Sequence, residues 1–357
     1  MLLVRAMRIA VVAVLAMAPG LAGCGGNGER SVELSGYRAM ARIGIGPPVA
    51  QRAAPSPPLV LAMDATDVVT VSVPDGRRRK LTRGPTRGLA NPRAPTWAPD
   101  GRSFAVATDD ARAVIIRLGS RMRTSVRDPL FGSLDSFAFS PDGRYLVATA
   151  GDPEASHPRP GLYAFDLRRG GRRLALLSGP VSGALSWSPD GHRIAFVRPK
   201  LTGPTVVHDG RREPAAPQTL VGGIAVLDLR SGSVRLVTGD GQDPAWSPDG
   251  RWIAFVSHRG GRGRSCGEDG CYRNGELDLI RPDGSGRRRL TRTPAGEGTP
   301  SWSPDGTRIV ARMAPNEFRG HSGLVTLAGD GSGYRVLVAP GAGGDISLGS
   351  GAWRPGG

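Results

Sequence analysis

One short phrase recurs along most of this 357-residue chain and constrains its fold more than any other feature. The fullest form of the phrase is Trp-Ser-Pro-Asp-Gly. Its aromatic anchors are Trp97, Phe139, Trp187, Trp246, Trp302 and, in a degenerate last copy, Trp353. The anchors are 42, 48, 59, 56 and 51 residues apart. These spacings are in the period range of β-propeller blades, so six copies in order predict a ring of repeated units.

Each copy of the phrase predicts a tight hairpin. Proline sets φ for the first corner of a type I turn, aspartate suits the second corner, and glycine takes the left-handed position that completes the hairpin. Continuously apolar runs follow, as at residues 194–197 and 253–256, and predict strands that are covered on both faces. A third and a fourth strand complete each unit. The 53 Gly and 31 Pro fit these many turns and argue against long helices.

The two ends of the repeat region predict how the ring closes. Residues 59–84 supply only the second, third and fourth strands of a unit, at 59–63, 68–73 and 79–82. The missing first strand is the one around Trp353. Pairing this strand with the N-terminal strands hides two sheet edges at once. We therefore expect an all-β fold, a six-bladed β-propeller of four-stranded antiparallel blades over residues 59–357.

The phrase W-S-P-D-G-x-x-I-A-F and the closing R-x-L-T resemble the TolB-type (WD40-like) β-propeller repeat family. The resemblance covers residues 59–357 and implies the same six-bladed ring. This chain departs from TolB because residues 25–58, a segment of 34 residues, are too few for the N-terminal α/β domain of TolB. It also lacks the hydrolase domain of propeller-bearing peptidases. A TolB-like role in envelope traffic is therefore only an analogy.

The first residues predict export and a lipid anchor. Arg5 and Arg8 precede a short apolar run at residues 9–17, as in a secretory signal peptide. The sequence 21–24, Leu-Ala-Gly-Cys, resembles the lipobox of bacterial lipoproteins. That resemblance implies removal of signal peptide 1–23 and acylation (palmitate) of Cys24, which holds the protein extracytoplasmically on the cell membrane. Residues 24–58 then form the acylated cysteine and a flexible tether.

The charge of the chain is strongly positive, with 47 Lys and Arg against 31 Asp and Glu, or +16. Removal of Arg5 and Arg8 with the signal leaves +14, in a compartment without nucleic acid, so we exclude nucleic-acid binding. Many arginines fall in short turns on one face of the ring. We expect this face to lie toward the anionic membrane, or its arginines to cover blade edges without a partner. The candidates are Arg77, Arg78, Arg79, Lys80, Arg172, Arg173, Arg287, Arg288 and Arg289.

Cys266 and Cys271 are the cysteines that remain after Cys24 is assigned to lipid. An export compartment permits their oxidation, so we predict a disulfide that closes a small loop. Zinc binding is the alternative, but a lone C-x4-C with no second ligand pair supports it weakly.

Long loops collect on the other face of the predicted ring, at residues 151–160, 198–223, 257–276 and 312–323. Variable loops on a rigid scaffold usually carry function, so we expect a ligand to bind here. The candidate ligand residues are His157, His208, His258, His321, Asp152, Glu154, Glu268, Asp269 and Glu317.

The function that we predict is a monomeric binding or scaffold propeller that recognises a protein, peptide or envelope glycan. It has no cofactor and is not an enzyme. The alternative is an enzyme at the channel mouth, a metal-dependent hydrolase or lyase. One G-x-S-x-G string occurs at residues 263–267, but it lies in a Gly/Arg-rich loop rather than on a strand-to-helix elbow.

Overall fold

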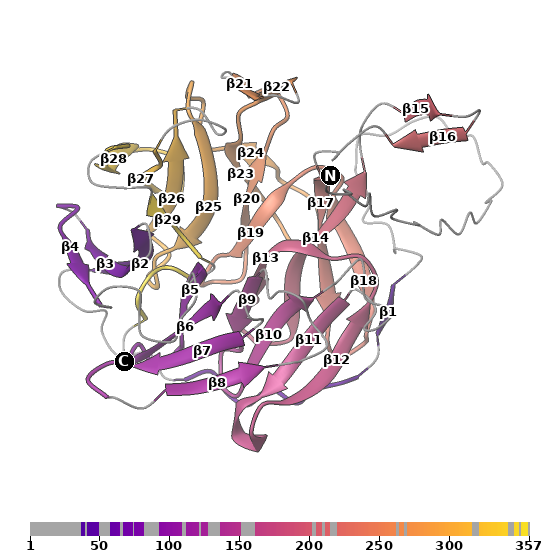
Figure 1. Ribbon diagram of the computed structural model, residues 1–357, viewed down its shortest axis with the longest axis vertical. Helices are drawn as coiled ribbons and strands as arrows, with labels where there is room; N and C mark the ends of the chain where they lie inside the picture. Colours follow the sequence, from indigo (N-terminus) through magenta and orange to yellow (C-terminus); the bar gives the residue numbers. More distant parts are fainter. Residues whose placement is uncertain are drawn as a thin grey trace, which may run out of the picture.

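The computed structural model describes residues 37–39, 41–49, 58–64, 67–73, 75–81, 93–108, 112–120, 123–127, 136–150, 161–201, 205–208, 211–214, 220–261, 264–267, 270–315, 321–341, 346–349 and 351–355. Six antiparallel sheets stand around one axis and form a six-bladed β-propeller (Figure 1). The predicted fold class is therefore confirmed. The predicted signal peptide and Cys24 lie outside the described residues.

The strands of the blades are given from the inner strand outward. Blade 1 consists of β29 (Ile346–Ser347), β2 (Leu59–Asp64), β3 (Asp67–Ser72) and β4 (Arg78–Lys80). Blade 2 consists of β5 (Arg93–Trp97), β6 (Ser103–Thr108), β7 (Arg112–Arg117) and β8 (Arg123–Arg127). Blade 3 consists of β9 (Ser136–Phe139), β10 (Tyr145–Ala150), β11 (Gly161–Asp166), the 3₁₀ turn η1 (Leu167–Arg169) and β12 (Arg172–Ser178).

Blade 4 consists of β13 (Ser182–Trp187), β14 (Arg193–Leu201), β17 (Leu220–Asp228) and β18 (Val234–Thr238). Blade 5 consists of β19 (Gln242–Trp246), β20 (Ile253–Ser257), β23 (Glu276–Ile280) and β24 (Arg288–Arg289). Blade 6 consists of β25 (Gly296–Trp302), β26 (Arg308–Ala314), β27 (Gly323–Ala328) and β28 (Arg335–Val338). Two hairpins lie outside the blades, β15 (Thr205–His208) with β16 (Arg211–Pro214) and β21 (Arg264–Gly267) with β22 (Gly270–Arg273).

The repeated phrase forms the turn between the first and second strands of a blade. In blade 6, Ser303 Oγ donates to Asp305 Oδ1 at 2.6 Å, and the same carboxylate accepts the backbone N–H of Thr307 at 3.0 Å. Gly306 has φ +71°, which a residue with a Cβ rarely adopts. The same serine-to-aspartate hydrogen bond occurs at Asp142, Asp190 and Asp249, so short-range contacts set these hairpins, as the sequence predicts.

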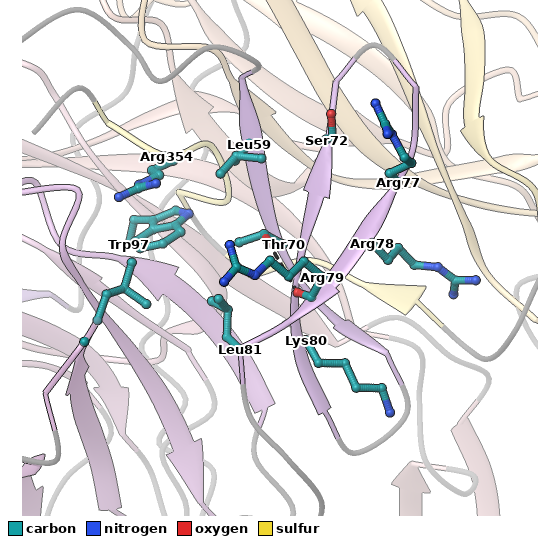
Figure 2. Close-up of a pocket in the computed structure, with 12 residues that line it drawn as sticks. Leu59, Thr70, Ser72, Arg77, Arg78, Arg79, Lys80, Leu81, Trp97 and Arg354 are labelled. Atoms are coloured by element: carbon teal, nitrogen blue, oxygen red, sulfur yellow. Dashed lines mark hydrogen bonds between the residues drawn. The ribbon is translucent and has the colours of Figure 1, made fainter.

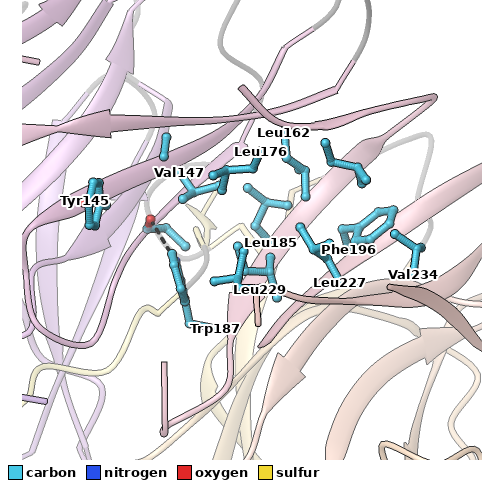
Figure 3. Close-up of a cluster of buried hydrophobic side chains, with 14 of the residues drawn as sticks. Tyr145, Val147, Leu162, Leu176, Leu185, Trp187, Phe196, Leu227, Leu229 and Val234 are labelled. Carbon is cyan, nitrogen blue, oxygen red and sulfur yellow. Dashed lines mark hydrogen bonds between the residues drawn. The ribbon is translucent and has the colours of Figure 1, made fainter. Parts of the chain in front are cut away.

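The hydrophobic core lies between neighbouring blades. Figure 3 shows the contact of blades 3 and 4, where Leu162, Phe196 and Leu227 are almost fully buried. The anchoring tryptophan also connects adjacent inner strands, since Trp187 Nε1 donates to the carbonyl oxygen of Ala138 in blade 3 at 3.4 Å. Because each sheet is covered on both faces, its middle strands are apolar without alternation.

The C-terminal segment closes the ring, as predicted. Ile346 pairs with Asp64, and Val60 forms a β-bridge with Trp353. Two backbone hydrogen bonds extend the contact, from Leu61 N to the oxygen of Ala352 at 2.7 Å and from Arg354 N to the oxygen of Leu59 at 2.8 Å. Blade 1 is therefore built from both ends of the propeller sequence.

Residues 37–39 and 41–49 differ from the expected flexible tether, because they pack against the propeller. We call them the strap. Its strand β1 (Arg38–Ala39) adds a fifth strand to the outer edge of blade 3 through β12. The strap then continues to the turns of blades 3 and 4, where Gly46 N donates to Asp142 Oδ2 at 2.8 Å. Tyr37, Ile43 and Ile45 join the core between the two blades, so apolar burial holds the segment in place.

Candidate functional site

The propeller has two faces, which we name by their loops. The short-turn face carries the repeated phrase and the turns from third to fourth strands. The long-loop face carries the connections from second to third strands and from one blade to the next. Hairpins β15–β16 and β21–β22 both belong to the long-loop face, and they project from the ring beyond the blades (Figure 1). In blade 4, β14 and β17 stay paired as far as Leu201 and Leu220, which extends that blade toward the first hairpin.

The candidate ligand residues of the long-loop face are only partly described. His157, Asp152, Glu154, Glu268, Asp269 and Glu317 lie outside the described residues. The backbone of His208 ends β15, while its side chain lies outside the description. His258 is half-buried just after β20, and His321 is exposed just before β27. Within the described ranges, no three His, Cys, Asp or Glu side chains are grouped to hold a metal ion.

Cys266 and Cys271 lie opposite each other in the β21–β22 hairpin. This register agrees with the predicted disulfide, which stays a prediction because the side chains of this hairpin lie outside the description.

Asp243 connects three inner strands at the propeller axis and was not among the sequence-based candidates. Its Oδ2 accepts the backbone N–H of Thr299 in blade 6 at 3.1 Å, and its carboxylate also accepts the N–H of Ala184 in blade 4. Burial raises the pKa of Asp243, against these hydrogen bonds. The cavity beside it measures about 20 Å³, room for about one water molecule. Comparison of the six repeats points to this position, because only Asp243 is acidic three residues before an anchor.

Two buried glutamates from neighbouring blades meet around one hydroxyl group. Thr291 Oγ1 lies 2.9 Å from Glu276 Oε2 and 3.0 Å from Glu297 Oε2, and it accepts the backbone N–H of Leu277 at 2.8 Å. A hydroxyl has one proton to donate, so only one of the two carboxylates can receive it. The other short contact requires a proton on a carboxyl group.

Glu297 is the member of this carboxyl pair whose pKa is raised by its surroundings. Burial raises the pKa of Glu297 to about 7, although hydrogen bonds from Thr293, Tyr334 and Thr291 act against the shift. The negative charge of Glu276 raises it further. Only 2% of Glu297 and 0% of Glu276 is exposed, so the pair is a structural group inside the contact of blades 5 and 6.

Several of the basic candidates are neutralised by carboxylates of the same chain. Arg78 pairs with Asp64 at 2.9 Å and Lys80 with Asp67 at 2.6 Å. Arg287 lies between blades 4 and 5 and contacts Asp240 at 2.6 Å and Asp278 at 2.8 Å.

The remaining basic candidates have varied surroundings. Arg289 also contacts Asp278, at 3.2 Å. Arg288 lies over the ring of Trp252, and Arg173 lies 5.6 Å from the ring centroid of Tyr163. Arg77 pairs with the neighbouring Asp75, and Arg172 is exposed. These side chains therefore do not form a uniformly cationic face.

A cleft of about 610 Å³ lies between blades 1 and 2 (Figure 2). Its apolar wall comes from Leu59, Leu81, Trp97 and Leu118. Arg79 extends toward Leu81 and Trp97, whereas Arg78 and Lys80 point to the opposite side.

Arg354 borders the same cleft and lies 5.3 Å above the ring of Trp97, while its Nε donates to the carbonyl oxygen of Gly101 at 2.9 Å. Among the described residues, neither Arg79 nor Arg354 has a carboxylate partner. The sequence predicted Arg79 as a basic candidate but not Arg354 or Trp97, because the contact between the chain ends brings Arg354 here.

The part of the chain that the structure describes contains no helix long and apolar enough to span a bilayer.

Comparisons with known proteins agree on the fold. No protein-family model matches the chain. Two curated relatives are an uncharacterised peptidase, YuxL of Bacillus subtilis, and an uncharacterised protein, Atu1656 of Agrobacterium fabrum. The first is 29% identical over 134 residues, 37% of this chain and 17% of that protein. The second is 28% identical over 222 residues, 61% of this chain and 64% of that protein. The chain thus spans less than two thirds of the length of either relative.

Solved structures with the same ring include two TolB proteins. One, from Agrobacterium tumefaciens, matches with a TM-score of 0.60 and 20% identity, over 83% of this chain and 97% of that chain. The other, from Acinetobacter baumannii, matches with a TM-score of 0.59 and 18% identity, over 84% of this chain and 67% of that chain. A nidogen/laminin complex matches with a TM-score of 0.58 at only 8% identity, over 82% of this chain and 97% of that chain. The likeness shows a TolB-like propeller fold.

Proposed function

We propose that this protein is a lipid-anchored, extracytoplasmic binding propeller that recognises a protein partner through its long-loop face. The observation that carries the proposal is the pair of hairpins that project from blades 4 and 5 on this face (Figure 1). Loops mounted on a rigid scaffold commonly carry binding sites. The backbone of hairpins β15–β16 and β21–β22 extends well beyond the compact turns of the other face.

The strap supports an orientation in which the long-loop face is nearer the membrane. Tyr37 OH donates to the carbonyl oxygen of Pro180 at 2.6 Å, and Pro180 lies in the loop from blade 3 to blade 4 on the long-loop face. Twelve residues lie between Cys24 and Tyr37, and a flexible chain of that length spans roughly 20 Å. We infer that the short-turn face is turned away from the bilayer, which is the reverse of the orientation that the arginines alone suggest.

The anchor and the binding face are tested separately. Cys24→Ser is expected to release the protein from the membrane fraction and to abolish incorporation of labelled palmitate. If the Cys24→Ser protein remains in the membrane fraction, the proposed lipid anchor at Cys24 is wrong. This conclusion holds whatever the result for the binding face.

For the binding face, residues 264–273 and residues 205–214 are each replaced by two glycines in the full chain. Both variants and the wild type are cross-linked in the native envelope, and the partner is identified by mass spectrometry. Loss of the wild-type partner from either variant supports the proposal. The control inserts two glycines after Asp283, in a turn of the short-turn face, and retains the partner. Retention of the partner by both hairpin variants contradicts recognition through this face.

A further inference from the structure

The grooves between neighbouring blades are not all filled in the same way. Between blades 3 and 4, the strap occupies the outer part of the groove and buries Tyr37, Ile43 and Ile45 against the core. Between blades 1 and 2, the corresponding space is the cleft of about 610 Å³. A chain segment of this protein therefore shows what kind of occupant such a groove accepts.

The two grooves share one backbone hydrogen bond on their second blade. Leu229 N donates to the oxygen of His192 in blade 4, as Leu118 N donates to the oxygen of Arg102 in blade 2. Gly232, in the turn three residues after Leu229, lies against Ala39 of the strap. Gly119, just after Leu118, faces open space with no atom within 4 Å of the position that a Cβ would take. Among the residues that the structure describes, none takes the place of the strap beside Gly119 between blades 1 and 2.

The outer edges on the first blade of each groove also correspond. Strand β12 is the fourth strand of blade 3, and its outer edge pairs with β1 of the strap. Strand β4 is the fourth strand of blade 1, and within the described ranges no strand pairs with its outer edge. An extended segment can add to such an edge through main-chain hydrogen bonds, while its side chains enter the adjacent cleft.

The charge of the cleft between blades 1 and 2 indicates which kind of segment can bind in it. Arg79 and Arg354 lack carboxylate partners among the described residues and lie beside the apolar Leu59, Leu81 and Trp97. Guanidinium groups bind carboxylates through paired hydrogen bonds. The chain's own neighbouring segments, residues 50–57 and 82–92, contain arginines and no acidic residue, so they do not supply this charge.

We propose that the cleft between blades 1 and 2 is a second binding site, which takes an extended segment of another protein with acidic and bulky apolar side chains. The segment adds to β4 as the strap adds to β12. Its apolar side chains pack on Trp97 and its carboxylates pair with Arg79 and Arg354. This site lies apart from the hairpins of the long-loop face, so the two can be occupied together.

The test uses a fluorescent 13-residue peptide with the sequence of residues 37–49 carrying Arg38→Glu and Arg42→Glu, and fluorescence anisotropy with the full chain. We expect saturable binding that weakens at least tenfold in Arg79→Glu and in Arg354→Glu. The matched control is Arg251→Glu, because the Arg251 side chain is 82% exposed on the short-turn face. We expect this control substitution to leave the affinity for the peptide unchanged. The unaltered strap peptide, with its two arginines, binds at least tenfold more weakly.

Three outcomes overturn the proposal. The first is no saturable binding of the acidic peptide. The second is equal affinity for the acidic and the unaltered peptide, because charge then plays no part. The third is an affinity that Arg79→Glu and Arg251→Glu reduce equally. Vesicles with anionic lipid provide a further arm: binding to them that Arg79→Glu abolishes, without discrimination between the peptides, identifies a membrane surface instead.

Discussion

Replacement of Glu297 by Gln tests the carboxyl pair between blades 5 and 6. Glutamine has the shape of a protonated glutamate. Its amide N–H can donate to Thr291 Oγ1, 3.0 Å from Glu297 Oε2, while Thr291 donates to Glu276. Its amide oxygen can accept from Tyr334, whose hydroxyl lies 2.9 Å from Glu297 Oε1. The variant therefore keeps these hydrogen bonds and removes only the titratable carboxyl group.

The size of the effect follows from linkage. Glu297 has a pKa of about 7 in the folded protein, against about 4.3 in an unfolded chain. The unfolded chain therefore loses its proton first as pH rises, and the folded state becomes less stable between about pH 4 and pH 7. At about 1.4 kcal/mol for each pKa unit, reduced for relaxation around the charge, Glu297 costs about 2 to 3 kcal/mol of stability above pH 7. Glu297→Gln is expected to regain this amount.

Urea unfolding at pH 4.5, 6, 7.5 and 8.5 measures the difference. The free energies of unfolding of the variant and the wild type should agree at the lowest pH and diverge to the stated amount at the highest. Asp330→Asn, in an exposed turn of blade 6, serves as the control and shows no such divergence. A difference between Glu297→Gln and wild type that does not change with pH refutes the raised pKa of Glu297.

Three further predictions concern the rest of the scaffold. Removal of residues 345–357 takes away the inner strand of blade 1 and should abolish the cooperative unfolding transition, so an unchanged melting curve contradicts ring closure. Arg287→Gln should destabilise the protein by about 2 kcal/mol, because it leaves the almost fully buried Asp278 with less compensation. Burial acts to raise the pKa of Asp240, but hydrogen bonds from Arg287 and Ser257 outweigh it and lower that pKa to about 2. Its stabilising effect is therefore present above pH 4 and lost as pH falls toward 2, and acid unfolding of Arg287→Gln should begin at higher pH than in wild type. Reduction of the Cys266–Cys271 disulfide should cost roughly 2 kcal/mol, whereas alkylation of both cysteines in the unreduced, denatured protein contradicts the bond.

The blades and their closure were predictable because their signals are local. Each Pro-Asp-Gly turn is set by side chains within a few residues, as Asp305 and Ser303 show. The absence of a first strand before Leu59 also identified Trp353 as its replacement.

The strap and the carboxyl pair were not predictable in the same way. Tyr37 and Ile45 show no strand or helix period, and the edge that receives the strap lies about 140 residues further along, at Leu177 and Ser178. Glu276 and Glu297 belong to different blades, so only the packed ring reveals that they share one hydroxyl. That no described carboxylate pairs with Arg79 likewise depends on the neighbouring Asp64 and Asp67, which pair with Arg78 and Lys80 instead.

The strap also determines how a mechanical load enters the molecule. A pull on the chain ahead of Tyr37 acts first on β1 and on the side chains held between blades 3 and 4. The seam of blade 1, where Val60 meets Trp353, lies further along the chain and stays unloaded until the strap detaches. The contact that closes the ring is thereby shielded from tension applied to the N-terminal chain.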